Sequence, residues 1–304
     1  MTVLLARLIN GLSLGSVYAM IALGYTMVYG IAKMLNFAHG DVIMVGAYIC
    51  FYAVNSFHMP ALVGVLAAVL VCTVLGVVIE KLAYRPLREA PSLAVLITAI
   101  GVSYFLQNAA LLLWSANPKI FPSFFVRNAV NEAGETVTVR SVEIGPLSMS
   151  YVTIFTIAAC VAIMLLLTWF TGQTKWGKAM RACSEDKGAA QLMGINVNAT
   201  ISLTFAIGSG LAAIAGVLLC SAYPRLAPTT GSMPGIKAFT AAVFGGIGSI
   251  PGAFLGGLLL GVLEIFSMAF ISTQLSDAVV FAALIAVLLI KPTGLLGRQI
   301  REKV

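Results

Sequence analysis

Long apolar runs, separated by short polar segments, constrain this 304-residue chain more than any other feature. Each run is roughly 17 to 25 residues long, the length that an α-helix needs to cross the hydrocarbon core of a bilayer. Only 10% of the residues are charged, whereas soluble domains carry about 25%. Such a chain cannot cover a water-facing surface, so we predict an all-α, polytopic transmembrane helix bundle.

The apolar runs predict about eight membrane spans and one short broken or re-entrant segment. The spans are expected at 9–31, 38–57, 61–82, 92–115, 151–171, 200–222, 251–271 and 276–291. A further apolar piece at about 236–249 is too brief to cross as an ordinary helix. We expect one transmembrane domain over residues 1–304. The first run is longer than the apolar part of a secretory signal, so no cleaved leader is expected.

The positions of Lys and Arg predict which loops face the cytoplasm. Twelve of the 18 basic residues fall on one side, in the loops 80–90 and 172–199, in the tail, and at Lys33. The other six are Arg7, Lys119, Arg127, Arg140, Arg225 and Lys237. Cytoplasmic loops carry the excess of basic residues, so the first side is predicted to be cytoplasmic. If Arg225 lies outside and the tail lies inside, an odd number of crossings must separate them. The two spans at 251–271 and 276–291 supply only two, so the short segment at 236–249 must reach the inside as well. The same count of crossings puts the N-terminus outside.

The polar stretch from Trp176 to Asn196 is predicted to form a short amphipathic helix on the cytoplasmic face. Its apolar side would carry several alanines together with Leu192 and Met193. Ser184 is the expected N-cap and Gly194 the expected stop. A helix of this kind between two spans is suited to binding a partner that lies outside the membrane.

The outer loop 117–150 is the sizeable extramembrane piece on the opposite side. After the turn-like NEAG, its second half alternates in the manner of a strand, which predicts a small β-hairpin. Two roles stay open for this loop: a lid that ties helices together, or a docking surface for a periplasmic partner.

The segment NFAHGD, between the first two spans, also has two interpretations. Asn36 or Asp41 would cap the second helix while Gly40 permits a bend. Alternatively Asn36, His39, Gly40 and Asp41 belong to a gate or transport path. No cluster of further histidines or carboxylates lies nearby in the sequence, so we predict no metal site and no catalytic residues here.

Glycines interrupt the chain at 244–257, where Gly245, Gly246, Gly248 and Pro251 break any continuous helix. Either they form a tight turn, or they form a reversal that lines the transport route; the parity argument favours the reversal. Elsewhere, pairs of glycines spaced by three residues, such as 11 with 15 and 257 with 261, predict close helix packing.

Charged residues within apolar runs are costly and therefore suggest function. Glu264 lies well inside the seventh long span, where it would pair with a partner subunit or face the path. Asp277 lies near the start of the last span, and Glu80 is expected to be interfacial beside Lys81. Five cysteines without metal-ligand spacing predict packing roles.

The sequence contains no complete nucleotide-binding motif and no cofactor site. The stretch from Gly172 to Lys178 matches the first part of a phosphate-binding loop, but Ala179 follows where Ser or Thr must ligate Mg²⁺. A membrane span also precedes it where a strand is required. We therefore expect no nucleotide site, no cofactor and no enzymatic activity in this chain.

Three stretches resemble the permease subunits of ABC importers for branched-chain amino acids, specifically the H-type permease. They are GYTMVYGIAKMLNFAHGDVIMVGAY (24–48), GKAMRACSEDKGAAQLMGINVN (177–198) and KAFTAAVFGGIGSIPGAFLGGLLLGVLE (237–264), with the closing KPTGLLG (291–297). The resemblance implies that the loop 172–199 carries the helix that couples the permease to its ATPase. The characteristic positions of that coupling helix are Gly177, Ala182, Asp186, Ala190 and Gly194.

The resemblance also implies partners: a second, related permease, two cytoplasmic ATP-binding subunits and a periplasmic solute-binding protein, in the lipid of a bacterial inner membrane and without nucleic acid. Urea and short-chain amide permeases share these motifs, so they remain an alternative. A secondary transporter driven by an ion gradient is a further alternative. It would need intramembrane ion ligands, for which Glu264 is the only strong candidate.

Overall fold

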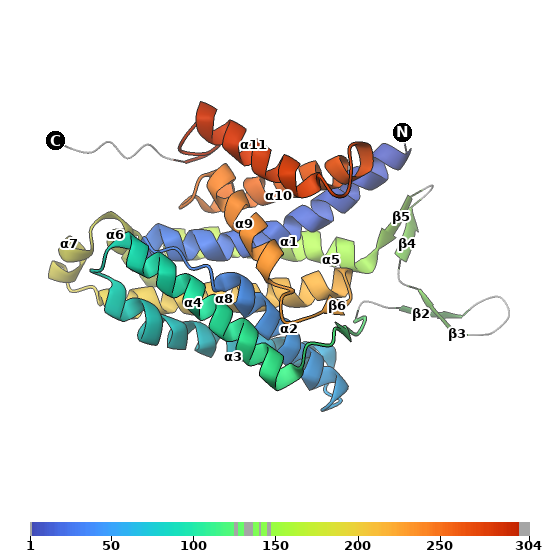
Figure 1. Ribbon diagram of the computed structural model, residues 1–304, viewed down its shortest axis with the longest axis horizontal. Coiled ribbons are helices and arrows are strands. Elements are labelled where there is room, and N and C mark those ends of the chain that lie inside the picture. Colours follow the sequence, from blue (N-terminus) through green and yellow to red (C-terminus); the bar gives the residue numbers. More distant parts are fainter. Residues whose placement is uncertain (1, 125–126, 131–135, 140, 145–146, 298–304) are drawn as a thin grey trace.

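The computed structural model describes residues 2–297, apart from 125–126, 131–135, 140 and 145–146. Across these residues the chain forms an elongated bundle of helices (Figure 1). The cytoplasmic loop of the sequence analysis lies at one end of the bundle, and the paired strands of the outer loop lie at the other. The two extramembrane pieces therefore sit on opposite faces of the predicted membrane body.

The helices fall at all eight places where spans were expected, and they carry the following bounds. They are α1 (Thr2–Ala32), α2 (His39–Asn55), α3 (Ala61–Ile79), α4 (Ser92–Trp114), α5 (Tyr151–Gln173), α6 (Lys175–Glu185), α7 (Lys187–Leu192), α8 (Val197–Ala222), α9 (Ser232–Gly245), α10 (Ile250–Phe270) and α11 (Ser276–Ile290). A π-helical turn, η1 (Glu80–Tyr84), and a 3₁₀ turn, η2 (Arg85–Leu87), continue α3.

Six helices in the described part of the chain are long and apolar enough to cross a membrane: α1, α3 with its continuation, α4, α5, α8 and α10. Helices α2 and α11 have 17 and 15 residues. At 1.5 Å per residue they reach about 26 and 23 Å, less than the ~30 Å of a hydrocarbon core. The helical fold is confirmed, whereas the predicted count of eight spans is not.

Helices α1 and α8 form the centre of the bundle. Most residues of α8 are buried, and α1 packs against α5, α8, α9 and α10. The contact of α1 with α10 is close because glycines face each other: a Cβ on Gly261 would lie 2.2 Å from the Cα of Gly15. The spaced glycines therefore do what was predicted and let two backbones meet.

The glycine-rich stretch after α9 is a sharp reversal. Helix α9 ends at Gly245, and Gly246 and Gly248 take φ angles of +106° and +95°, which side chains with a Cβ rarely adopt. Helix α10 begins after Ser249, whose hydroxyl accepts a hydrogen bond from the Gly252 amide at 3.2 Å. The predicted helix break is confirmed, and α9 packs back on α10.

The closing stretch of the described chain fastens this reversal. The amides of Leu295 and Leu296 donate to the carbonyls of Phe244 and Gly245, each at 2.9 Å. The last carbonyls of a helix have no partner within it. Residues 291–297 therefore complete the end of α9.

The outer loop contains strands, as predicted, but it forms two antiparallel pairs rather than one hairpin. Strands β2 (Arg127–Val130) and β3 (Thr136–Val139) pair, as do β4 (Ser141–Ile144) and β5 (Leu147–Ser150). The turn-like NEAG lies outside the described residues. A third pair, β1 (Lys119–Ile120) with β6 (Arg225–Leu226), joins this loop to the end of α8.

Candidate functional site

The loop predicted to face the cytoplasm folds as two short helices, α6 and α7, set at a tight corner after α5. Thr174 caps α6, because its hydroxyl accepts a hydrogen bond from the amide of Gly177 at 3.0 Å. A Cβ on Gly177 would lie 2.2 Å from the carbonyl oxygen of Phe170. Glycine at position 177 is therefore required for the chain to turn this closely out of the membrane.

Asp186 divides the predicted single helix into α6 and α7. Its backbone is extended (φ −150°, ψ 114°), and its carboxylate accepts a hydrogen bond from the Ala189 amide at 2.9 Å. The prediction that Ser184 caps a helix is wrong: Ser184 lies inside α6 and donates to the carbonyl of Arg181. The stop at Gly194 is confirmed, with a φ of +81°.

The exposure of the positions predicted to form the coupling helix is uneven. Ala190 is buried against the membrane body and Ala182 is half-buried, whereas Asp186 and Gly194 are exposed. Leu192 and Met193, expected on the inward side, are instead 90% and 83% exposed. The tip of the loop thus presents two large apolar side chains to whatever lies beyond the membrane.

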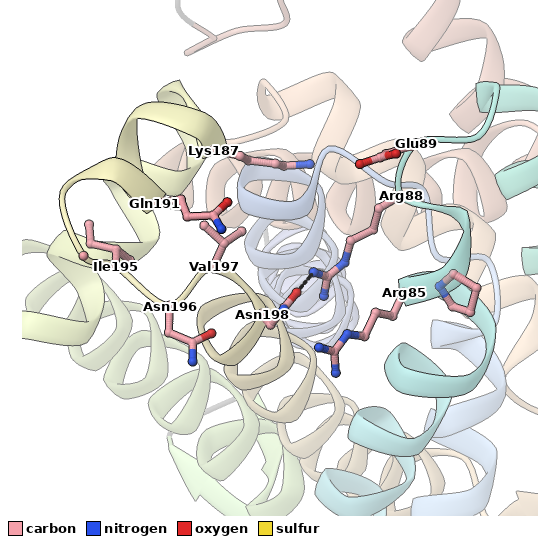
Figure 2. Close-up of a pocket in the computed structure, with 11 residues that line it drawn as sticks. Arg85, Arg88, Glu89, Lys187, Gln191, Ile195, Asn196, Val197 and Asn198 are labelled. Atoms are coloured by element: carbon pink, nitrogen blue, oxygen red, sulfur yellow. Dashed lines mark hydrogen bonds between the residues drawn. The ribbon is translucent and has the colours of Figure 1, made fainter.

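A cleft of about 710 Å³ separates α7 and the start of α8 from the turn η2 (Figure 2). Arg88 spans one side of this cleft, with one hydrogen bond to the amide oxygen of Asn198 and an ion pair to Glu80. The hydroxyl of Ser202 also donates to Glu80 at 2.6 Å. Glu80 is fully buried within the protein, and its partners are Arg88 and Ser202.

Lys187 ties α7 to α1. Its ammonium donates to the carbonyl of Ala32, the last residue of α1, at 3.0 Å. Partial burial holds the pKa of Lys187 below its usual value, and the nearby charges of Arg88 and Lys33 act in the same direction. Sequence reasoning missed Lys187 and Arg88 as structural contacts, because their partners lie 155 and 110 residues away.

The NFAHGD segment enters α2 without a side-chain cap. The N-cap position is Ala38, so the prediction that Asn36 or Asp41 caps this helix is wrong. Asn36 instead accepts a hydrogen bond from the hydroxyl of Tyr84 at 2.9 Å. Asp41 accepts one from the side chain of Gln107 at 3.0 Å. Both contacts join the segment to neighbouring helices.

Gly40 and His39 are sites of close packing. A Cβ on Gly40 would lie 2.7 Å from the carbonyl oxygen of Gly231, just before α9. The buried ring of His39 lies 4.6 Å from the ring of Tyr25. These contacts bring the start of α2 against α1 and the start of α9.

Glu264 belongs to an ionic cluster inside this chain. It accepts a hydrogen bond from the hydroxyl of Tyr18 at 2.9 Å and pairs with Lys237 at 2.7 Å. Lys237 also pairs with Asp277 at 2.6 Å. The tally of basic residues assigns Lys237 to the side opposite the predicted cytoplasmic loops, but the structure buries it within α9.

The predicted path residues fall in three places. The segment from Asn36 to Asp41 leads into α2, and Gly245, Gly246, Gly248 and Pro251 form the α9–α10 reversal, which approaches α1 where Gly248 meets Gly30. Glu264 lies apart from both, in the ionic cluster. Among the described residues no group of three His, Cys, Asp or Glu side chains could hold a metal ion.

The described chain is therefore a helical membrane body with an exposed two-helix unit, α6–α7, on one face. The sequence matches the family described as "Branched-chain amino acid transport system / permease component" over residues 7–288. This chain belongs to that family of ABC permeases.

Three of its relatives match over nearly their full length. A branched-chain amino acid permease protein, BraD, of Pseudomonas aeruginosa is 47% identical over 99% of this chain and 98% of its own. The LivH permease proteins of Salmonella typhimurium and Escherichia coli K12 are each 45% identical, over 99% of this chain and 97% of theirs. Both names describe high-affinity branched-chain amino acid transport.

Proposed function

We propose that this chain forms part of the path by which an ABC importer carries branched-chain, apolar amino acids across a bacterial inner membrane. The observation that carries the proposal is the exposed α6–α7 unit on a membrane body of this family. The unit is the coupling helix of the importer, and it docks on a separate ATP-binding subunit.

Contacts behind α6 and α7 suit them to this task. Helix α6 packs against α1, α5 and α8, and Lys187 holds α7 to the end of α1. A pull on the unit therefore reaches three helices of the central bundle at once. The glycine-containing segments around 36–46 and 244–257 are the ones that would change backbone conformation as access alternates.

The proposed assembly contains a second permease, two ATP-binding subunits and a periplasmic solute-binding protein. The outer loop, with its paired strands, is the surface offered to the binding protein. The substrate class rests on the names of the relatives, which are permease proteins for branched-chain amino acids.

Uptake by the reconstituted complex tests this function. The chain is assembled with the ATPase, second permease and binding protein encoded beside it, and [¹⁴C]leucine uptake into proteoliposomes is measured with and without ATP. We expect ATP-dependent uptake that isoleucine and valine inhibit and excess urea does not. Uptake of urea in place of leucine would overturn the assignment of the substrate. Uptake without the ATPase subunits would overturn the assignment of the chain to an ATP-driven importer.

A further inference from the structure

A second hollow, of about 860 Å³, opens beside the coupling unit between α3 and α8, with the corner of α5 and α6 at its rim. It meets the first cleft at Arg85, Asn196 and Asn198, which line both. Figure 2 shows Arg85 extending toward the side where these two asparagines lie. We call this second hollow the lateral groove.

Both walls of the lateral groove change from polar to apolar in the same direction. On the α3 side, Arg85 and Lys81 stand at the cytoplasmic end, and Val77 lies one turn further into the membrane. On the α8 side, the asparagines at the start of the helix give way to Leu203 and Ile207. The groove therefore has a basic mouth and an apolar trough, the profile of a phospholipid.

The charge at the mouth has no partner among the residues that the structure describes. Neither Lys81 nor Arg85 has a side-chain hydrogen bond or ion pair among the described residues, and no Asp or Glu lines the groove. The buried carboxylate beneath it, Glu80, is already paired with Arg88. Two free cations at a cytoplasmic membrane edge attract an anionic headgroup.

Trp176 marks the depth of the mouth. It lines the groove and is 50% exposed. Tryptophan concentrates at the headgroup level of a bilayer, because its ring is apolar while its N–H is polar. The mouth thus lies where lipid headgroups lie, and the trough lies where acyl chains lie.

We propose that the lateral groove binds an acidic phospholipid of the cytoplasmic leaflet. Lys81 and Arg85 contact the phosphate, the asparagines contact the glycerol, and an acyl chain fills the trough beside Val77 and Ile207. A soluble phosphate would leave the apolar trough empty, so the lipid is the occupant that fits the whole groove. This site is independent of the transported solute.

Native mass spectrometry of the assembled transporter tests the site. The detergent-solubilised complex is titrated with phosphatidylglycerol or with phosphatidylcholine of the same acyl chains. We expect about 30-fold more bound phosphatidylglycerol, since two cations near the surface, each worth about 1 kcal/mol, together favour the anionic lipid by about 2 kcal/mol. The double variant Lys81→Gln, Arg85→Gln loses this preference.

Three controls make the test decisive. Lys175→Gln with Lys178→Gln removes two cations of α6 that do not line the groove, and lipid retention stays at the wild-type level. Lys81→Arg with Arg85→Lys keeps the charge and keeps the lipid. Glycerol 3-phosphate in 100-fold excess fails to displace the lipid, because it has no acyl chain.

The proposal is overturned if the wild type shows no preference for the acidic lipid, or if the glutamine double variant retains it. Displacement by glycerol 3-phosphate would overturn it too, since the mouth alone would then be a phosphate site. If the α6 control variant lost as much lipid as the Lys81, Arg85 double variant, the preference would come from general surface charge and the proposal would be overturned.

Discussion

The ammonium of Lys237 lies 2.7 Å from a carboxylate oxygen of Glu264, and both side chains are buried where the sequence is strongly apolar. The pair joins α9 to α10, and Asp277 extends it to α11. A charge in such a place is stable only when another charge and hydrogen bonds compensate it. The second carboxylate oxygen of Glu264 meets this need through Tyr18.

Replacing Lys237 with Met should therefore destabilise the chain strongly. The substitution leaves Glu264 as an unpaired buried charge, and loss of one partner of such a pair costs about 3–5 kcal/mol. We expect a large drop in the thermal midpoint of the purified complex. Lys237→Met with Glu264→Gln removes both charges and should recover most of the loss. Equal midpoints for the single and double variants would contradict the ion pair.

Asp186 should act in coupling through its cap on α7. Asp186→Ala removes the acceptor for the Ala189 amide, a loss of about 1 kcal/mol at a helix N-terminus. We expect ATP-dependent uptake to fall several-fold while the amount of chain in the membrane is unchanged. Asp186→Asn is the matched control, because Asn caps equally well and should keep most of the uptake. Full uptake by the alanine variant would refute the role of this residue.

The close approach of α1 and α10 should not tolerate a methyl group. In Gly261→Ala the new Cβ would meet the backbone of Gly15 at 2.2 Å, and overpacking of this kind costs about 1–3 kcal/mol. Gly101→Ala, in α4, adds the same atom where nothing lies within 4 Å. We expect a lower thermal midpoint for the first variant alone. A midpoint for Gly261→Ala that matches Gly101→Ala would show that the helices separate easily.

Lys187 should give the stability of the chain a pH dependence. Its pKa is lowered in the folded state, so the unfolded chain binds more protons between the two pKa values. The free energy of unfolding should therefore rise as the pH increases toward the ordinary lysine pKa of about 10.4. The measurement is the thermal midpoint from pH 8 to 10.5, compared with that of Lys187→Met. The thermal midpoint of the wild type should rise more with pH than that of the variant. Parallel curves would contradict a lowered pKa for Lys187.

Local features of this fold could be predicted from the sequence, whereas its long-range contacts could not. Run length and hydropathy place every long helix, and Gly246 and Gly248 mark the reversal because positive φ angles favour glycine. Asp186 and Ser184 are both good capping residues, and only the folded backbone decides between them. Lys237 and Glu264 stand 27 residues apart, and no local pattern around either residue indicates that they meet. Opposite charges in two apolar segments are the one signal that could have paired them.

Leu192 and Met193 carry a consequence for how the cell makes this chain. A copy without its partner holds two large, almost fully exposed apolar side chains at the tip of a short helix that is predicted to face the cytoplasm. Surfaces of this kind promote aggregation and recruit chaperones and proteases. The steady-state amount of the chain should therefore follow the supply of the subunit that covers this tip, so assembly itself protects the permease from degradation.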